Sequence, residues 1–191
     1  MHDRRQEIAE AAWRVILRDG LSRMSVRAVA REMSATTGLI SHHYANKDDL
    51  VATALDLVTQ RTMDTASEAG TDASGLERLE EMVLAAMPMS EESRREWQVW
   101  LAFLGYSIGN TNLIARHQQR YKTLRSFMAV EIRYLQAQSI ISPKRKPEAE
   151  ADALIALVDG VGLGAAVDAE RFTPERQRIL VRRHLDELRH T

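Results

Sequence analysis

The chain has 191 residues, of which 45% are hydrophobic, and a formal net charge of −1. This length is sufficient for a hydrophobic core, either in one domain or in a small domain joined to a larger one. Because the net charge is close to zero, a protein that coats nucleic acid through overall positive charge is excluded. The absence of cysteine excludes disulfides, thiolate nucleophiles and cysteine-bound metals. No long apolar run and no signal-peptide pattern occurs, so we expect a cytoplasmic protein with no membrane partner.

Apolar residues recur with helical spacing along the whole chain, and no segment alternates as a strand does. The sequence therefore predicts an all-α fold. We expect an N-terminal three-helix helix-turn-helix domain at residues 1–50 and a helical effector-binding and dimerisation domain at residues 51–191. About nine helices are predicted, at residues 4–19, 26–33, 37–43, 47–68, 76–87, 91–109, 112–140, 148–168 and 174–189.

The first four predicted helices have the spacing of a helix-turn-helix unit. Gly20 is a suitable residue to end the first helix, and Ser25, Thr36 and Asn46 are suitable N-caps for the next three. A short helix, a tight turn and a second short helix, preceded by a longer one, is the pattern of a DNA-reading helix-turn-helix.

Charge is unevenly distributed around this unit. Residues 22–47 contain four basic side chains and one acidic side chain, whereas residues 51–191 contain 18 basic and 20 acidic ones. A local positive patch on a weakly acidic protein suits a site-specific DNA binder, because phosphates attract the patch alone. The alternative is a solvated polar face on a small helical bundle that binds no DNA.

The outward side of the helix at 37–43 is expected to carry short hydrogen-bonding side chains around a glycine, which suits contact with base edges. These residues are Thr36, Thr37, Gly38, Ser41 and His42 or His43. Leu39 is a candidate for contact with a thymine methyl group. Lys47 begins the fourth helix, where it can reach a phosphate with help from the helix amides.

The segment from Ser25 to Leu50 resembles the signature of the TetR family of repressors. The matching positions are Ser25-Val26, Val29-Ala30, Gly38, Tyr44 and Asn46-Lys47-Asp48-Asp49-Leu50. Two positions depart from the family pattern: Met33-Ser34 stands in the turn where Ala-Gly is usual, and Ser41 stands where many members have a tyrosine. The second departure leaves the set of base-reading residues open.

The resemblance implies a role for each candidate in DNA binding. Arg27 matches family residues that contact phosphate or guanine, and Thr36, Thr37, Gly38, Ser41 and His42 match recognition-helix positions. His43, Tyr44 and Lys47 resemble positions that contact the DNA backbone. For Tyr44 a second interpretation is open, in which the ring belongs mostly to the core. Members of the family bind double-stranded DNA at palindromic operators as homodimers. Their last two helices form the dimer interface.

The predicted helix at 148–168 is apolar on nearly all sides between residues 153 and 167, and it contains several small residues. Such a helix requires burial, and small residues permit close contact between helices. Both properties suit a homodimer interface formed with the helix at 174–189. The three glycines at 160, 162 and 164 do not form a phosphate-binding loop, since no strand precedes them.

Four aromatic residues, Trp97, Trp100, Phe103 and Tyr106, recur every three residues in one predicted helix. One interpretation is core packing. The other is the wall of an effector site, in which Asp159 or Glu96 would supply an acid for a cationic ligand bound by cation–π contacts. Segments 37–44, 100–103 and 157–160 are similar to the choline-responsive BetI subfamily. The effector is therefore either a cation such as a quaternary amine, or an unspecified apolar or amphipathic molecule.

No catalytic constellation is present in the sequence. The histidines lack the spacing of a metal site on one helix, and no nucleophile motif occurs. We therefore expect no catalytic residue, no metal and no cofactor. The predicted function is a transcriptional repressor released by a small-molecule effector. The alternative is a TetR-like DNA-binding protein whose C-terminal domain binds a protein partner.

Overall fold

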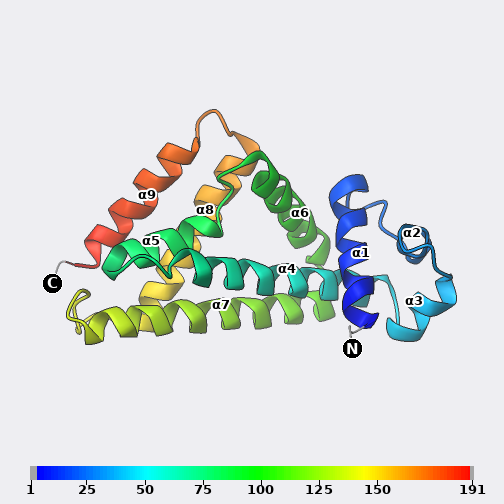
Figure 1. The fold of residues 1–191 in the computed structure, drawn as a ribbon, viewed down its shortest axis with the longest axis horizontal. Helices are drawn as coiled ribbons and strands as arrows, with labels where there is room; N and C mark the ends of the chain where they lie inside the picture. The colour runs from blue at the N-terminus through cyan, green and yellow to red at the C-terminus, as the bar shows by residue number, and fades with distance from the viewer. Residues whose placement is uncertain (1–3, 190–191) are drawn as a thin grey trace. The chain divides into compact units, whose positions relative to one another are not determined.

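The structure, a computed structural model, describes residues 4–189, and this part of the chain is entirely helical apart from its turns (Figure 1). The predicted all-α class is confirmed. No helix in this range is long and apolar enough to cross a membrane. The helices are α1 (Arg4–Asp19), α2 (Val26–Glu32), α3 (Thr37–His43), α4 (Lys47–Ala69), α5 (Gly75–Ala85), α6 (Glu91–Ser107), α7 (Thr111–Ala137), α8 (Pro147–Val167) and α9 (Pro174–Glu187).

The helix boundaries agree closely with the predicted ranges, because local capping determines most of them. Ser25, Thr36, Asn46 and Thr173 each accept a hydrogen bond from the backbone N–H three residues on. These bonds satisfy donors that the first turn of a helix leaves unpaired. The largest difference is at the end of α7, which was predicted to extend to residue 140 and stops at Ala137. The helix stops there because Ser139 adopts a positive φ of 59°.

The chain forms two compact units, and the first of them extends beyond the predicted division at residue 50. The first contains residues up to Arg61 and residues 98–117, and the second contains residues 62–97 and 118–191. Residues 51–61 and 98–117 belong with the N-terminal helices because they help to form the same core. Its members include Ile16, Val29, Ile40, Leu50, Leu55, Phe103 and Leu113. Whether DNA binding and effector binding separate at residue 50 stays a prediction.

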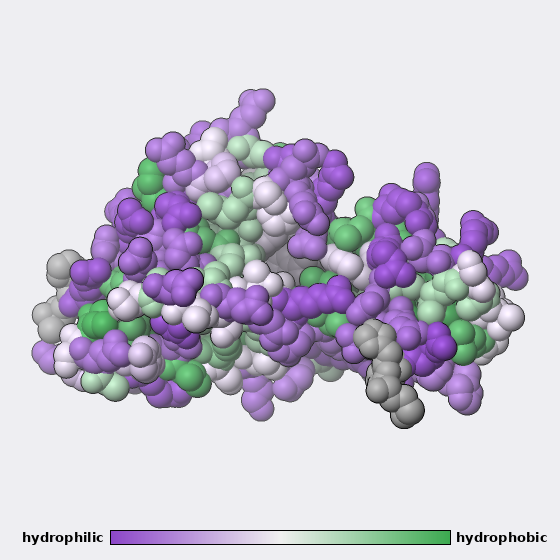
Figure 2. All heavy atoms as spheres, viewed as in Figure 1, coloured by the Kyte–Doolittle hydropathy of each residue, from purple (hydrophilic) through white to green (hydrophobic). Residues whose placement is uncertain are grey.

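The second unit has a separate core, formed where α5, α7, α8 and α9 pack together. Its largest fully buried side chains include Leu79, Met87, Ile132 and Leu135. Polar residues cover most of the molecular face in Figure 2, with smaller apolar areas between them. Each unit is therefore packed around its own hydrophobic core, and each carries one candidate site.

Candidate functional site

The first candidate site is the exposed side of α3. Thr36, Thr37, Gly38, Ser41 and His42 are all exposed to solvent. Ile40 is fully buried and anchors the opposite side of the helix in the core of the first unit. Leu39 and His43 are half-buried at the border between the two sides. The structure therefore brings the five predicted recognition-helix residues onto one accessible surface, with hydroxyl, imidazole and backbone groups available for base edges.

The turn between α2 and α3 places Ser34 in a backbone conformation that is unusual for serine. Ser34 has a φ of 52°, a left-handed conformation that glycine adopts more easily than any other residue. This conformation gives a physical reason for the glycine that the TetR signature usually has in the turn. The serine preserves the geometry, because the N–H of Ala35 still donates to the carbonyl of Ala30 at 2.8 Å.

The end of α3 is fastened to the start of α1 through Tyr44 and Arg5. Tyr44 is 2% exposed, and its hydroxyl donates to the carbonyl of Arg5 at 2.7 Å. The guanidinium of Arg5 lies 4.6 Å from the centre of the Tyr44 ring and donates to the carbonyl of His43 at 3.0 Å. Of the two interpretations of Tyr44, the structure therefore agrees with the second, in which the ring belongs to the core. The ring packs at the end of α3 on its buried side.

Arginines cover α2 and the adjoining turn, and the acid of this segment is already neutralised. Glu32 accepts hydrogen bonds from Arg18 at 2.7 Å and Arg14 at 3.1 Å, and these bonds hold the pKa of Glu32 below its usual range. Arg27 is exposed and pairs with no acid among residues 4–189. The predicted positive patch is therefore present, with its single acidic residue paired to α1.

Lys47 is half-buried at the start of α4, and its ammonium lies 3.4 Å from the carbonyl oxygen of Leu21. It also lies 5.7 Å from the centre of the Tyr106 ring, within the range of a cation–π contact. The lysine is thus held beside the loop that leads into α2, on the first turn of the helix that follows α3.

The five residues predicted to bind an effector are divided between the two units. Trp100, Phe103 and Tyr106 belong to the first unit. Phe103 is 1% exposed within its core, and Tyr106 donates a hydrogen bond to Asp48 at 2.6 Å. The ring of Trp100 lies 6.2 Å from that of His117. Phe103 and Tyr106 therefore have packing and hydrogen-bonding partners of their own, which their spacing along the helix did not reveal.

Trp97 and Asp159 both belong to the second unit and lie near the same part of α8. The Trp97 indole N–H donates to the carbonyl of Ala86 at 3.0 Å, which fixes the orientation of the ring. The ring lies against Gly162, so closely that a Cβ at this position would overlap it. Asp159 is three residues before Gly162, and residues three apart on a helix are neighbours. The indole and the carboxylate therefore approach the same side of α8.

Asp159 is half-buried. Tyr121 of α7 donates a hydrogen bond to its carboxylate, and no cationic side chain among residues 4–189 pairs with it. Burial raises the pKa of Asp159 above its usual range, and the tyrosine hydrogen bond opposes that shift. Burial also raises the pKa of Tyr121. An isolated carboxylate in such surroundings favours a bound cation.

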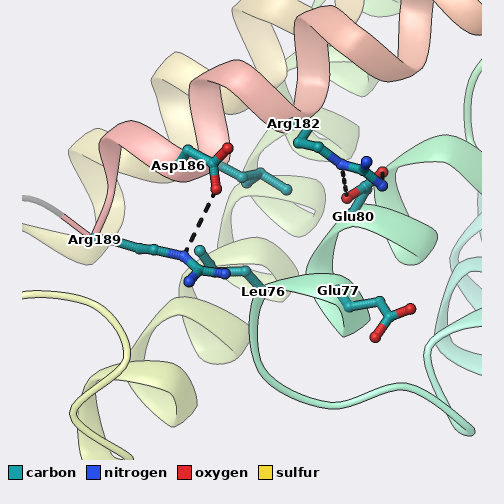
Figure 3. Close-up of a pocket in the computed structure, with 7 residues that line it drawn as sticks. Leu76, Glu77, Glu80, Arg182, Asp186 and Arg189 are labelled. Atoms are coloured by element: carbon teal, nitrogen blue, oxygen red, sulfur yellow. Dashed lines mark hydrogen bonds and ion pairs between the residues drawn. The ribbon is translucent and has the colours of Figure 1, made fainter.

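A pocket of about 220 Å³ lies between α5 and α9, and the five predicted effector residues do not line it (Figure 3). Arg182 donates to both carboxylate oxygens of Glu80, at 3.0 and 2.9 Å, and Arg189 lies 3.7 Å from Asp186. Both arginines of the pocket are therefore paired with carboxylates of its own lining, and Glu77 is a further acidic residue there.

Comparison with known proteins determines the family. Residues 8–54 match the family described as bacterial regulatory proteins, tetR family, and residues 75–190 match the family described as BetI-type transcriptional repressor, C-terminal. The chain belongs to the TetR family. It is therefore a DNA-binding transcriptional regulator with a helix-turn-helix, as the signature at residues 25–50 predicted.

Several relatives of this TetR-family regulator match over nearly its full length. The regulator PksA of Bacillus subtilis is 32% identical, with 97% of this chain and 89% of the relative covered. BetI of Vibrio vulnificus is 25% identical, with 96% and 91% covered. A crystallised regulator from Saccharomonospora viridis in complex with choline is 26% identical, with a TM-score of 0.76 and 98% and 95% covered. A regulator from a Rhodococcus species, 22% identical with a TM-score of 0.86, shares the fold over 99% of this chain and 100% of its own.

Sequence reasoning missed two residues of this regulator that the geometry singles out. Tyr121 is 38 residues from Asp159, and Arg5 is 39 residues from Tyr44. A lone tyrosine and a terminal arginine carry no motif, so only the packing of separate helices reveals these partners.

Proposed function

We propose that this regulator is a homodimeric repressor that binds a palindromic operator and is released by a small cationic effector, such as a quaternary amine. It would act in the cytoplasm, where operator DNA is located. The observation that carries the effector part is the half-buried carboxylate of Asp159, which has Tyr121 as its hydrogen-bonding partner and no neutralising cation among residues 4–189.

The exposed residues of α3 support the operator part of the proposal. Thr37, Ser41 and His42 would contact base edges, while Arg27 and Lys47 would contact phosphates. In a dimer, two recognition helices would enter successive major grooves about 34–36 Å apart, so the operator would be roughly palindromic.

The outer face of α8 supports dimerisation with a second copy of the chain. Between residues 153 and 167 its exposed residues recur with alternating spacings of three and four, the pattern of a helix that packs lengthwise against another helix. No atom lies within 4 Å of the position of a Cβ at Gly160, so a partner helix could approach closely there. Leu163 is 48% exposed and Val167 is 77% exposed, an unfavourable arrangement in a monomer. The exposed face consists of Ala153, Ala156, Gly160, Leu163 and Val167.

The chemistry of Trp97 and Asp159 supports a cationic effector. A quaternary ammonium group is recognised by aromatic faces, and a nearby carboxylate adds Coulomb attraction that burial strengthens. The relative from Saccharomonospora viridis that binds choline is 26% identical over 98% of this chain. Choline is therefore the first compound to test.

The experiment is a selection of random duplex DNA by the purified protein at about 150 mM salt with competitor DNA. We expect enrichment of a palindrome, followed by release of that palindrome when choline or a related quaternary amine is added. Absence of an enriched palindrome, with and without amine, would overturn the operator part. An enriched palindrome that no cation releases would overturn the effector part and favour a protein partner for the C-terminal domain.

A further inference from the structure

Tyr106 lies at the end of α6, where it contacts two consecutive residues at the start of α4. Its hydroxyl donates to the Asp48 carboxylate at 2.6 Å, and its ring lies 5.7 Å from the ammonium of Lys47. Lys47 is the residue of α4 that we assign to a DNA phosphate. A single aromatic side chain of α6 thus contacts both a candidate DNA-binding residue and the carboxylate next to it.

The second oxygen of Asp48 is held by the beginning of α7. The side-chain amide of Asn110 donates to it at 2.8 Å. The carbonyl oxygen of the same side chain accepts from the backbone N–H groups of Asn112 and Leu113, both at 3.2 Å, and so caps α7. Both polar atoms of the Asn110 side chain therefore have hydrogen-bonding partners. The Asp48 carboxylate accepts one hydrogen bond from Tyr106 of α6 and one from Asn110, which caps α7.

A second contact lies beside the first on the opening turn of α4. Arg116 of α7 donates to Asp49 at 2.8 Å, and the backbone N–H of Asp49 donates to the side chain of Asn46 at 2.9 Å. Asn46 lies two residues after Tyr44, which ends α3. The turn that follows the recognition helix is therefore connected by hydrogen bonds to the junction of α6 and α7.

We propose that Tyr106 is a positioning residue for DNA binding, which acts through Lys47 and Asp48. A lysine side chain has many rotamers, and confining it before binding reduces the entropy lost on contact with a phosphate. The Tyr106 ring on one side and the Leu21 carbonyl, 3.4 Å from the ammonium, on the other confine Lys47 in this way. The proposal rests on the proposed operator-binding function.

The test compares Tyr106→Phe, which keeps the ring and removes the hydroxyl, with Tyr106→Leu, which removes both. The probe is the duplex selected by the wild-type protein, and the affinity is measured over a range of salt concentrations. We expect Tyr106→Phe to bind about 3- to 10-fold more weakly, the effect of one lost hydrogen bond, and Tyr106→Leu to bind more weakly still. For Tyr106→Leu, which leaves Lys47 unconfined, the salt slope should fall by up to about 0.9, the value for one phosphate contact, as in Lys47→Gln.

The control is Tyr134→Phe, which alters an exposed tyrosine of α7 and should match the wild type. A purely structural role for Tyr106 would lower the melting temperature and leave the salt slope unchanged, which would overturn the proposal. Wild-type or tighter binding by Tyr106→Phe would also overturn it and leave the operator function intact. Failure of the wild-type protein to bind any selected duplex would overturn both.

Discussion

The ring of Trp97 occupies the space that any side chain at Gly162 would need. The indole cannot move away without a cost, because its N–H donates to the carbonyl of Ala86 at 3.0 Å. This close packing places the edge of the indole ring beside a residue one helical turn from Asp159. Residue 162 lies inside α8 and has no positive φ, so its backbone conformation does not require glycine. Glycine is required at this proposed effector site because any larger side chain would overlap the Trp97 ring.

Gly162→Ala should destabilise the protein by about 1–3 kcal/mol, as overpacking of a buried site does, and should weaken choline binding. Gly105→Ala in α6 is the matched control, since no atom lies within 4 Å of its Cβ position. It should stabilise the protein by up to about 1 kcal/mol through helix propensity. Urea unfolding and calorimetric titration measure the two effects. If both substitutions changed the free energy of unfolding in the same direction, this result would contradict the packing of Trp97 against Gly162.

Asp159→Asn should stabilise the ligand-free protein at neutral pH. Burial raises the carboxyl pKa in the folded state, so the charged form destabilises the fold above that pKa. The contribution of the Asp159 carboxyl group to folding stability is fully present below its unfolded pKa of 3.8. This contribution is lost as the pH rises through the folded pKa. The expected gain is on the order of 1 kcal/mol at pH 7 and should vanish below about pH 4.

Thermal unfolding across this pH range, with and without choline, provides the measurement. Choline at about 100 times its dissociation constant should add about 2.7 kcal/mol of stability to the wild type and much less to Asp159→Asn. Equal stabilisation of both proteins would remove Asp159 from the proposed effector site.

Gly160→Arg should convert the proposed dimer to a monomer while leaving the fold of each chain intact. The position is exposed in the single chain, with open space around it, but it lies in the middle of the α8 face that we assign to the partner copy. A buried, unpaired arginine in that interface would be strongly unfavourable. Light scattering after size-exclusion chromatography would report the mass, with Gly105→Arg as the matched control. A Gly160→Arg dimer would place the interface elsewhere.

Arg27→Ala and Lys47→Ala should each weaken binding to all duplexes by similar factors and reduce the salt slope by about 0.9. Thr37→Val should instead change which duplexes are preferred, by about 1–3 kcal/mol at the affected base pair. Fluorescence anisotropy with matched and mismatched duplexes separates the two patterns. Arg95→Ala, an exposed arginine paired with Glu91 in α6, serves as the control. A base-specific loss from Lys47→Ala would reverse the roles assigned here.

Ser34→Gly should stabilise the helix-turn-helix by about 0.5–1 kcal/mol, because the φ of 52° is strained for serine and relaxed for glycine. Ser34→Ala retains the strain and should give no such gain. Chemical denaturation measures the difference. If alanine stabilises as much as glycine, the left-handed conformation is not the cause.

Helix positions were predictable because their determinants are local. Caps such as Thr36 and Thr173 act on an N–H three residues away, and the spacing of apolar residues identifies the buried side of each helix. The boundaries of the two units could not be recognised in the same way. The residues of α6 and α7 that join the first unit are separated from its N-terminal helices by dozens of residues in the sequence.

By itself, the sequence determined the all-α class, the approximate helix boundaries and the TetR-type helix-turn-helix, since capping, periodicity and motif spacing are properties of neighbouring residues. Only the tertiary structure decided how the aromatic residues of α6 are used. Phe103 enters a core and Tyr106 binds Asp48, whereas Trp97 lies against Gly162. These roles depend on which helix packs beside each residue, and burial against a distant segment is not encoded by spacing along one helix.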